Sequence, residues 1–179
     1  MSLDTLLKVA PLVVSTLALA LSWRGYQQSG RAEGLSVRTA AVAELVDGLH
    51  RARRLARQAD VEPVSAEQVI AVMVDFEDRA HRHRAVLPGH LRAVGREVRA
   101  AMGNCFGTPA WAGLDARLAH GEMAAFDRYW WDVTHSYLEY VDAVLQDWRT
   151  APTSRRHTKL TGFHDWRREE DSAHFTPPA

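Results

Sequence analysis

The sequence has one cysteine, Cys105, among 179 residues. A single thiol excludes an intramolecular disulfide framework and every zinc site built from clustered cysteines. An excess of charge of one sign is also missing, because 22 Lys and Arg side chains balance 22 Asp and Glu side chains. A neutral chain has no overall attraction to nucleic acid or to anionic surfaces, so binding to either would need a local patch.

Lysine is nearly absent, since Lys8 and Lys159 are the only two and arginine carries almost all of the positive charge. This bias is typical of a high-GC genome and says nothing about mechanism. Catalytic motifs are missing as well: there is no HExxH run and no repeated Glu-x-x-His pair of the kind that di-iron bundles use. We therefore predict no cofactor, and the reaction, if there is one, cannot be read from the residues.

A long apolar run, VAPLVVSTLALALSW, is present from Val9 to Trp23 and holds no charged side chain. Extended back to Leu3, it reaches the roughly 20 helical residues that cross a bilayer, with only Asp4 and Lys8 as ionisable interruptions. We predict a single transmembrane helix here. Its residues include Leu3, Val9, Pro11, Leu21 and Trp23.

The charges that flank this run predict its orientation. Arg24, Arg31 and Arg38 follow it, whereas Lys8 alone precedes it. By the positive-inside rule, the short N-terminus lies outside the cell and the body of the chain lies in the cytoplasm.

Two other interpretations of the apolar run remain open. Ala18-Leu19-Ala20 has the small-x-small form of a signal-peptide cleavage site, so the chain could be secreted after cleavage near Ala20. The segment before it, MSLDTLLK, lacks the clear positive charge that such signals carry. A buried helix of a soluble core is the other alternative, although Ser15 and Thr16 are the only polar residues between Val9 and Leu21.

Apolar residues at helical spacing follow. A helix is predicted from Leu35 to residues 57–60, before Pro63, and a second helix begins at Ser65, which forms a capping box pattern with Gln68. The inward positions of the first are Leu35, Val42, Leu45, Leu49, Ala52 and Ala56. Those of the second are Val69, Met73, Phe76 and Ala80.

Further helices are predicted toward the C-terminus. Pro88 suits the first turn of one that closes at Gly103-Asn104, a short helix spans residues 108–121, and the clearest periodicity covers residues 126–148. The inward residues of the first are Leu91, Val94, Val98 and Met102. Those of the last are Phe126, Trp130, Val133, Tyr137, Val141, Val144 and Trp148, with Trp131, Leu138 and Leu145 as a second stripe.

These patterns predict an all-α fold: an N-terminal transmembrane helix that continues into an antiparallel bundle of about four helices, with a flexible C-terminal tail. The divisions are a membrane anchor at 1–28, a helical bundle domain at 29–149 and a mobile polar tail at 150–179. The tail is polar and aperiodic, although residues 163–170 are compatible with a short helix. This layout resembles that of uncharacterised single-pass, N-terminally anchored helical proteins of high-GC actinobacteria. The resemblance is one of architecture and transfers no functional motif.

One polar cluster has the spacing of a weak candidate metal site. Glu77 and His81 stand one turn apart, and His83 follows. A third ligand would have to come from a facing helix, and an ordinary charged helix face explains the same spacing.

Other clusters also have ordinary explanations. Arg51, Arg53, Arg54 and Arg57 form a basic patch that could contact phosphate, but a solvated helix face explains it and the neutral chain does not favour nucleic acid. Asp132, His135 and Glu139 are predicted to face water or a partner, opposite the apolar seam. Cys105 is predicted to be a buried structural residue.

We therefore expect a membrane-anchored helical protein of the cell membrane that is non-enzymatic and acts as a protein-interaction or regulatory module at the cytoplasmic face. A protein partner or a second copy of the chain would bind the bundle. The alternative is a metal-dependent or hydrolytic enzyme that uses Glu77, His81 and His83.

Overall fold

A computed structural model describes residues 22–23, 34–106, 123–150 and 158–174. The chain divides into two units, Met1–Thr39 and Ala40–Ala179. The first unit contributes the beginning of a helix over residues 34–59, in which the Thr39 hydroxyl donates to the Leu35 carbonyl at 2.9 Å.

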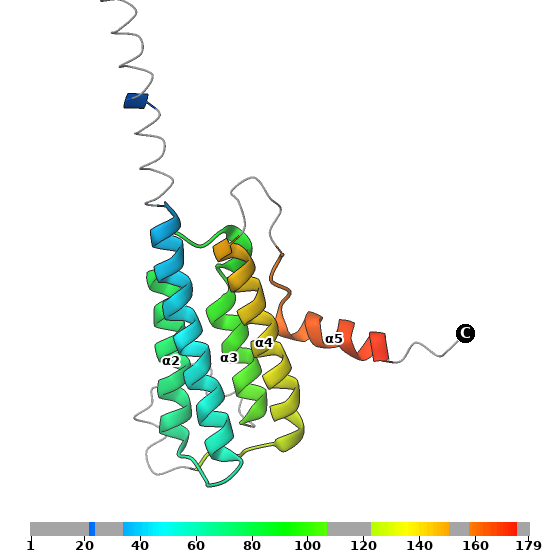
Figure 1. The fold of residues 1–179 in the computed structure, drawn as a ribbon. Coiled ribbons are helices and arrows are strands. Elements are labelled where there is room, and N and C mark those ends of the chain that lie inside the picture. Colours follow the sequence, from blue (N-terminus) through cyan, green and yellow to red (C-terminus); the bar gives the residue numbers. More distant parts are fainter. Residues whose placement is uncertain (1–21, 24–33, 107–122, 151–157, 175–179) are drawn as a thin grey trace, which may run out of the picture. The chain divides into compact units, whose positions relative to one another are not determined.

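Within its described residues, the second unit is an all-helical bundle, as predicted. The bundle is formed by residues 40–59 of the 34–59 helix, followed by α2 (Ala66–Arg82), α3 (Val94–Cys105) and α4 (Arg128–Thr150). Each of these helices is antiparallel to the one before it (Figure 1). A short 3-10 helix, η1 (Gly89–Leu91), precedes α3, and α5 (Phe163–His174) follows α4.

Local signals position α2 as predicted. Ser65 is its N-cap, and the hydroxyl of Ser65 accepts from the Gln68 amide while the Gln68 side chain accepts from the Ser65 amide. This capping box satisfies two amides that the first turn leaves open. The predicted inward face is buried: Val69, Met73, Phe76 and Ala80 all lie in the core, as do Leu45 and Leu49 on the preceding helix.

The ends of α3 and α4 differ from the predictions. Pro88 is the N-cap of η1, and α3 starts six residues later at Val94 and runs past Gly103-Asn104 to Cys105. The α4 helix starts at Arg128 because Asp127 caps it: its carboxylate accepts from the amides of residues 129 and 130 at 2.9 and 3.2 Å. The predicted short helix at residues 108–121 lies outside the described residues.

The α4 helix supplies much of the core, as its periodicity predicted. Tyr137, Leu138, Val141 and Leu145 are completely buried. Trp130 and Val133 are only partly buried, and Phe126 lies before the helix begins. Thr134 is buried although it is polar, because its hydroxyl donates to the Ala101 carbonyl of α3 at 2.9 Å. A buried polar group needs such a partner.

The prediction of a mobile tail from residue 150 is wrong for the part of it that packs on the bundle. Phe163 is completely buried, and its ring meets that of Tyr137 edge-on at 5.1 Å. The Tyr137 hydroxyl donates to the Thr161 carbonyl, and the Tyr140 hydroxyl donates to the Lys159 carbonyl. We call this contact of residues 158–166 with α4 the aromatic interface.

Among the described residues, no helix is long and apolar enough to cross a membrane. The predicted transmembrane segment, Leu3–Trp23, falls almost wholly outside those residues, so it stays a prediction. Of that segment only Ser22 and Trp23 are described, and the Trp23 side chain is exposed.

Candidate functional site

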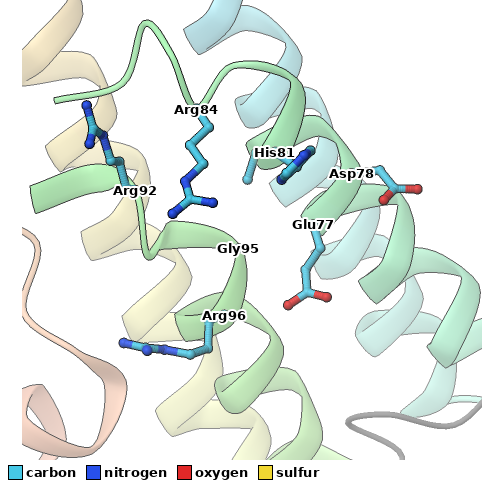
Figure 2. Close-up of a pocket in the computed structure, with 8 residues that line it drawn as sticks. Glu77, Asp78, His81, Arg84, Arg92, Gly95 and Arg96 are labelled. Atoms are coloured by element: carbon cyan, nitrogen blue, oxygen red, sulfur yellow. The ribbon is translucent and has the colours of Figure 1, made fainter. Parts of the chain in front are cut away.

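A polar cleft of about 300 Å³ lies between the C-terminal half of α2 and the start of α3 (Figure 2). Its lining residues are Glu77, Asp78, Ala80, His81, Arg84, Arg92, Gly95 and Arg96. Two of them, Glu77 and His81, belong to the candidate site predicted from sequence. Gly95 lets the two helices approach, because a Cβ there would lie 3.2 Å from the Ala80 Cβ and 3.3 Å from the Glu77 Cγ.

Glu77 is directed toward α3. Its carboxylate pairs with Arg99 at 2.9 Å, and both side chains are about three-quarters buried. Burial raises the pKa of Glu77 above its ordinary value, and the positive charge of Arg99 acts in the opposite direction. Glu77 therefore belongs to an interhelical ion pair at the edge of the cleft.

His83 is directed to the other side of α2. Its Nε2 lies 3.0 Å from the Glu44 carboxylate on the 34–59 helix, and Arg82 approaches the same carboxylate at 3.6 Å. The structure therefore brings Glu77 and His81 together at the cleft but separates His83 from them. Over the described part of the chain, no three His, Cys, Asp or Glu side chains are grouped as ligands of one metal ion would be.

A charged network joins the 34–59 helix to α2, and we call it the ion-pair interface. Arg79, whose side chain is 11% exposed, is at its centre. Its guanidinium donates to Asp75 at 2.8 Å, to Asp47 at 3.1 Å and to the Glu44 carbonyl at 3.1 Å. The hydrogen bond that Arg79 donates to Asp75 raises the pKa of Arg79, burial lowers it, and the charges of the nearby carboxylates raise it further, so the net change is an increase. One largely buried cation thus bridges two half-exposed carboxylates.

The predicted basic patch is divided by this network. Arg51 pairs with Asp47 at 3.0 Å and lies 3.6 Å from Asp75, so its charge is used within the bundle. Arg53 is half-buried, whereas Arg54 and Arg57 are exposed. The four arginines therefore do not form one uniform surface for an anion.

The remaining predicted candidates have structural surroundings. His135 lies 3.2 Å from Glu139, and Asp132 is exposed, so this trio faces outward as predicted. Cys105 is completely buried, and burial raises the pKa of its thiol to about 12, with a smaller contribution from the charge of Asp127. A thiol with that pKa is protonated near neutral pH and is a poor nucleophile.

A surface feature that sequence reasoning missed lies where two connecting segments run side by side. Ser65 and Met123 form an isolated antiparallel bridge, and the Ala124 amide donates to the Val64 carbonyl at 2.9 Å. Asp60 and Arg128 form an ion pair between the same segments.

Three large apolar side chains are exposed on these two segments. Val61 is 88% exposed, Met123 is 57% exposed and Tyr129 is 62% exposed. We call these three side chains the apolar patch. No periodicity could have revealed it, because Val61 and Met123 lie in two different connections and Tyr129 lies in the first turn of α4.

Comparison with known proteins identifies no relative: no protein-family model matches the chain, and no curated protein and no solved structure matches it.

Proposed function

We propose that this chain is a membrane-anchored helical module that presents its bundle to a protein partner at the cytoplasmic face of the cell membrane. The observation that carries the proposal is the apolar patch of Val61, Met123 and Tyr129. Large apolar side chains gathered on a surface are typical of protein interfaces, and tyrosine and methionine are enriched there.

The position of the patch fits this role. Glu44, near the start of the bundle, contacts Arg82 and His83, whereas the patch lies beyond the other end of the same helix. The chain arrives from the proposed anchor at the Glu44 end, so the patch lies at the opposite end of the bundle. In a module that is tethered at one end, the opposite end is free to meet a partner.

The anchor rests on the apolar run Val9–Trp23, and its orientation rests on the arginines that follow. A single cysteine introduced at the exposed Glu62 tests the orientation in intact cells. We expect a membrane-impermeant maleimide to label Glu62→Cys only after the cells are lysed. Labelling of intact cells would contradict a cytoplasmic bundle. The buried Cys105 does not interfere, because the reagent cannot reach it in the folded chain.

Photo-crosslinking tests the patch. A photoreactive phenylalanine analogue is placed in turn at Val61, Met123 and Tyr129, and at Val74 of α2, which is 43% exposed, as the control. We expect the three patch positions to give the same discrete adduct and Val74 to give none.

The mass of that adduct identifies the partner class. An adduct with another protein supports the proposal as stated, and an adduct of two copies of this chain indicates that the module binds itself. Adducts that are equally frequent at Val74 would contradict a specific patch. An aspartate at Val61 should abolish the adduct from Tyr129, because a charge at the centre of an apolar contact is costly to bury.

The alternative, a metal-dependent or hydrolytic enzyme that uses Glu77, His81 and His83, has less support. Glu77 pairs with Arg99 of α3, while His83 pairs with Glu44 of the 34–59 helix. Elemental analysis of the full-length protein, with a Glu77→Ala, His81→Ala double variant as the comparison, tests it. A stoichiometric transition metal that the double variant loses would favour the enzyme.

A further inference from the structure

The cleft between α2 and α3 combines residues of three origins. His81 comes from the last turn of α2, Arg84 from the connection that follows, and Arg92 and Arg96 from the start of α3 and the residues before it. Figure 2 shows the Arg84 side chain extending from that connection toward Gly95 and the first turn of α3. Three arginines thus line one concave, solvent-open site.

The carboxylates in and beside the cleft cancel part of this charge, that of Arg96 included. Glu77 is neutralised by Arg99 at 2.9 Å, and Asp78 is the other carboxylate that lines the cleft. Glu97, beside the cleft, takes two hydrogen bonds from Nε and Nη2 of Arg96 on one oxygen and the Phe163 amide on the other.

The guanidinium groups retain donors. Within the described residues, Arg84 makes no ion pair, and Arg92 uses only its Nε, in a long contact of 3.4 Å with the Leu87 carbonyl. Each guanidinium has five N–H donors in a planar fork, so both residues keep most of theirs for a ligand.

The start of α3 adds to this preference for an anion. Its N-cap is Ala93, which makes no side-chain capping hydrogen bond. The first turn of a helix carries partial positive charge and amides directed outward. Gly95 lies in this turn at the base of the cleft, and it has no side chain that would cover the turn.

We propose that this cleft binds a phosphate group that carries at most one ester bond, with Arg84 and Arg92 as its principal contacts and Arg96 and His81 beside them. Arginine suits this ligand because its planar fork matches two phosphate oxygens at once. A cleft of about 300 Å³ has room for a phosphate group and a small substituent.

Two sources could supply this chemistry. The contacts of Glu44 with Arg82 and His83 put the cleft at the end of the bundle where residue 40 enters. If the proposed anchor holds, the phosphate could belong to the headgroup of a lipid such as phosphatidic acid. A free phosphate is the other source. Only the lipid source depends on the proposed function, and the site itself does not.

Calorimetric titration of the full-length chain in a non-ionic detergent tests the proposal. The probes are inorganic phosphate and a short-chain phosphatidic acid, and short-chain phosphatidylcholine, whose phosphate is a diester, is the control lipid. We expect at least one of the two probes to bind and the control lipid not to bind. Binding of inorganic phosphate with similar affinity identifies a free-phosphate site, whereas binding of phosphatidic acid alone identifies a headgroup site.

Variants decide whether the cleft is responsible. Removing one charge-assisted contact should weaken binding about tenfold or more, so Arg84→Gln and Arg92→Gln are each expected to do so. The matched control is Arg57→Gln, which removes the same charge from an exposed position outside the cleft and should leave affinity unchanged.

Thermal unfolding of each variant without ligand shows whether its fold is intact. Because the Arg84 side chain is exposed, we expect Arg84→Gln to leave the unfolding midpoint unchanged. The proposal is overturned if neither inorganic phosphate nor phosphatidic acid binds the folded wild-type chain. It is also overturned if Arg57→Gln weakens binding as much as the cleft variants do.

Discussion

The ion-pair interface between the 34–59 helix and α2 is stabilised by charged side chains, whereas the aromatic interface is stabilised by packed rings and by hydrogen bonds to backbone carbonyls. Arg79 bridges Asp47 and Asp75 in the first, and Phe163 fills the second with an exposed fraction of 0%. The first joins two helices that follow each other along the chain. The second joins residues 158–166, which follow the bundle in the sequence, to α4.

This difference predicts different energetics. Half-exposed ion pairs contribute little each and are screened by salt, unless one partner is buried as Arg79 is. A buried aromatic ring contributes through area removed from water and packing, both of which are insensitive to moderate salt. We therefore expect the two interfaces to respond unequally to the same kind of substitution.

The largest effect is expected at the aromatic interface. Phe163→Ala removes a completely buried ring and should lower the free energy of unfolding by about 3 to 5 kcal/mol, measured by urea denaturation. Glu169→Ala, at an exposed position of the same helix, should cost less than about 0.5 kcal/mol. Equal losses for the two variants would show that α5 is not part of the stable core.

At the ion-pair interface, Arg79→Ala should cost about 2 to 3 kcal/mol, because it leaves two carboxylates and a carbonyl without their shared donor. The control is Arg51→Ala, which removes a side chain that is 47% exposed and that contacts the same two carboxylates. Its cost should stay below about 1 kcal/mol. Denaturation at low and high salt sharpens the comparison. A Phe163→Ala loss that fell with salt as much as the Arg79→Ala loss would contradict it.

The close approach of the two helices at the ion-pair interface depends on Gly48. A Cβ there would lie 2.7 Å from Cδ2 of Phe76, a buried ring that cannot easily move. Gly48→Ala should therefore cost about 1 kcal/mol or more, although alanine is the better helix former by about 1 kcal/mol. Gly34→Ala, where an added Cβ meets open space, should cause no loss of thermal stability. A Gly48→Ala variant that melts above the wild type would mean that the helices can separate without penalty.

The smallest effect concerns pH. A hydrogen bond from His83 lowers the pKa of Glu44 below its ordinary value of 4.5, with further contributions from the charges of His83 and Arg82. Because the folded pKa is depressed, the contribution of Glu44 to stability is present above 4.5 and is lost as the pH falls through the folded value.

The Glu44→Gln variant should remove this part of the acid dependence and leave stability near neutral pH slightly reduced. Free energies of unfolding measured across that acid range for both proteins check it. Identical slopes for wild type and variant would show that Glu44 has no part in the acid response.

Sequence predicted most where the determinant is local. The capping box of Ser65 and Gln68 and the inward face of α2 require only neighbours along the chain, and both were confirmed. The seam of α4 was confirmed at its centre, where Tyr137 and Val141 are buried.

The aromatic interface could not be predicted in the same way. Phe163 contacts Tyr137, which is 26 positions earlier in the chain, and polar neighbours such as Arg167 and Glu169 make the segment resemble a solvated tail. The available signal was the spacing of Phe163 and Trp166, one helical turn apart in a polar sequence. For the same reason, sequence spacing grouped Glu77, His81 and His83, although the fold directs His83 toward a different helix.

The most direct test of the proposed function is the intact mass of the protein recovered from an alkaline-washed membrane fraction. We expect the full-length chain in the membrane, because the run VAPLVVSTLALALSW would be retained as an anchor. A soluble species that begins near Leu21 would contradict it, since cleavage there means secretion and excludes a cytoplasmic partner.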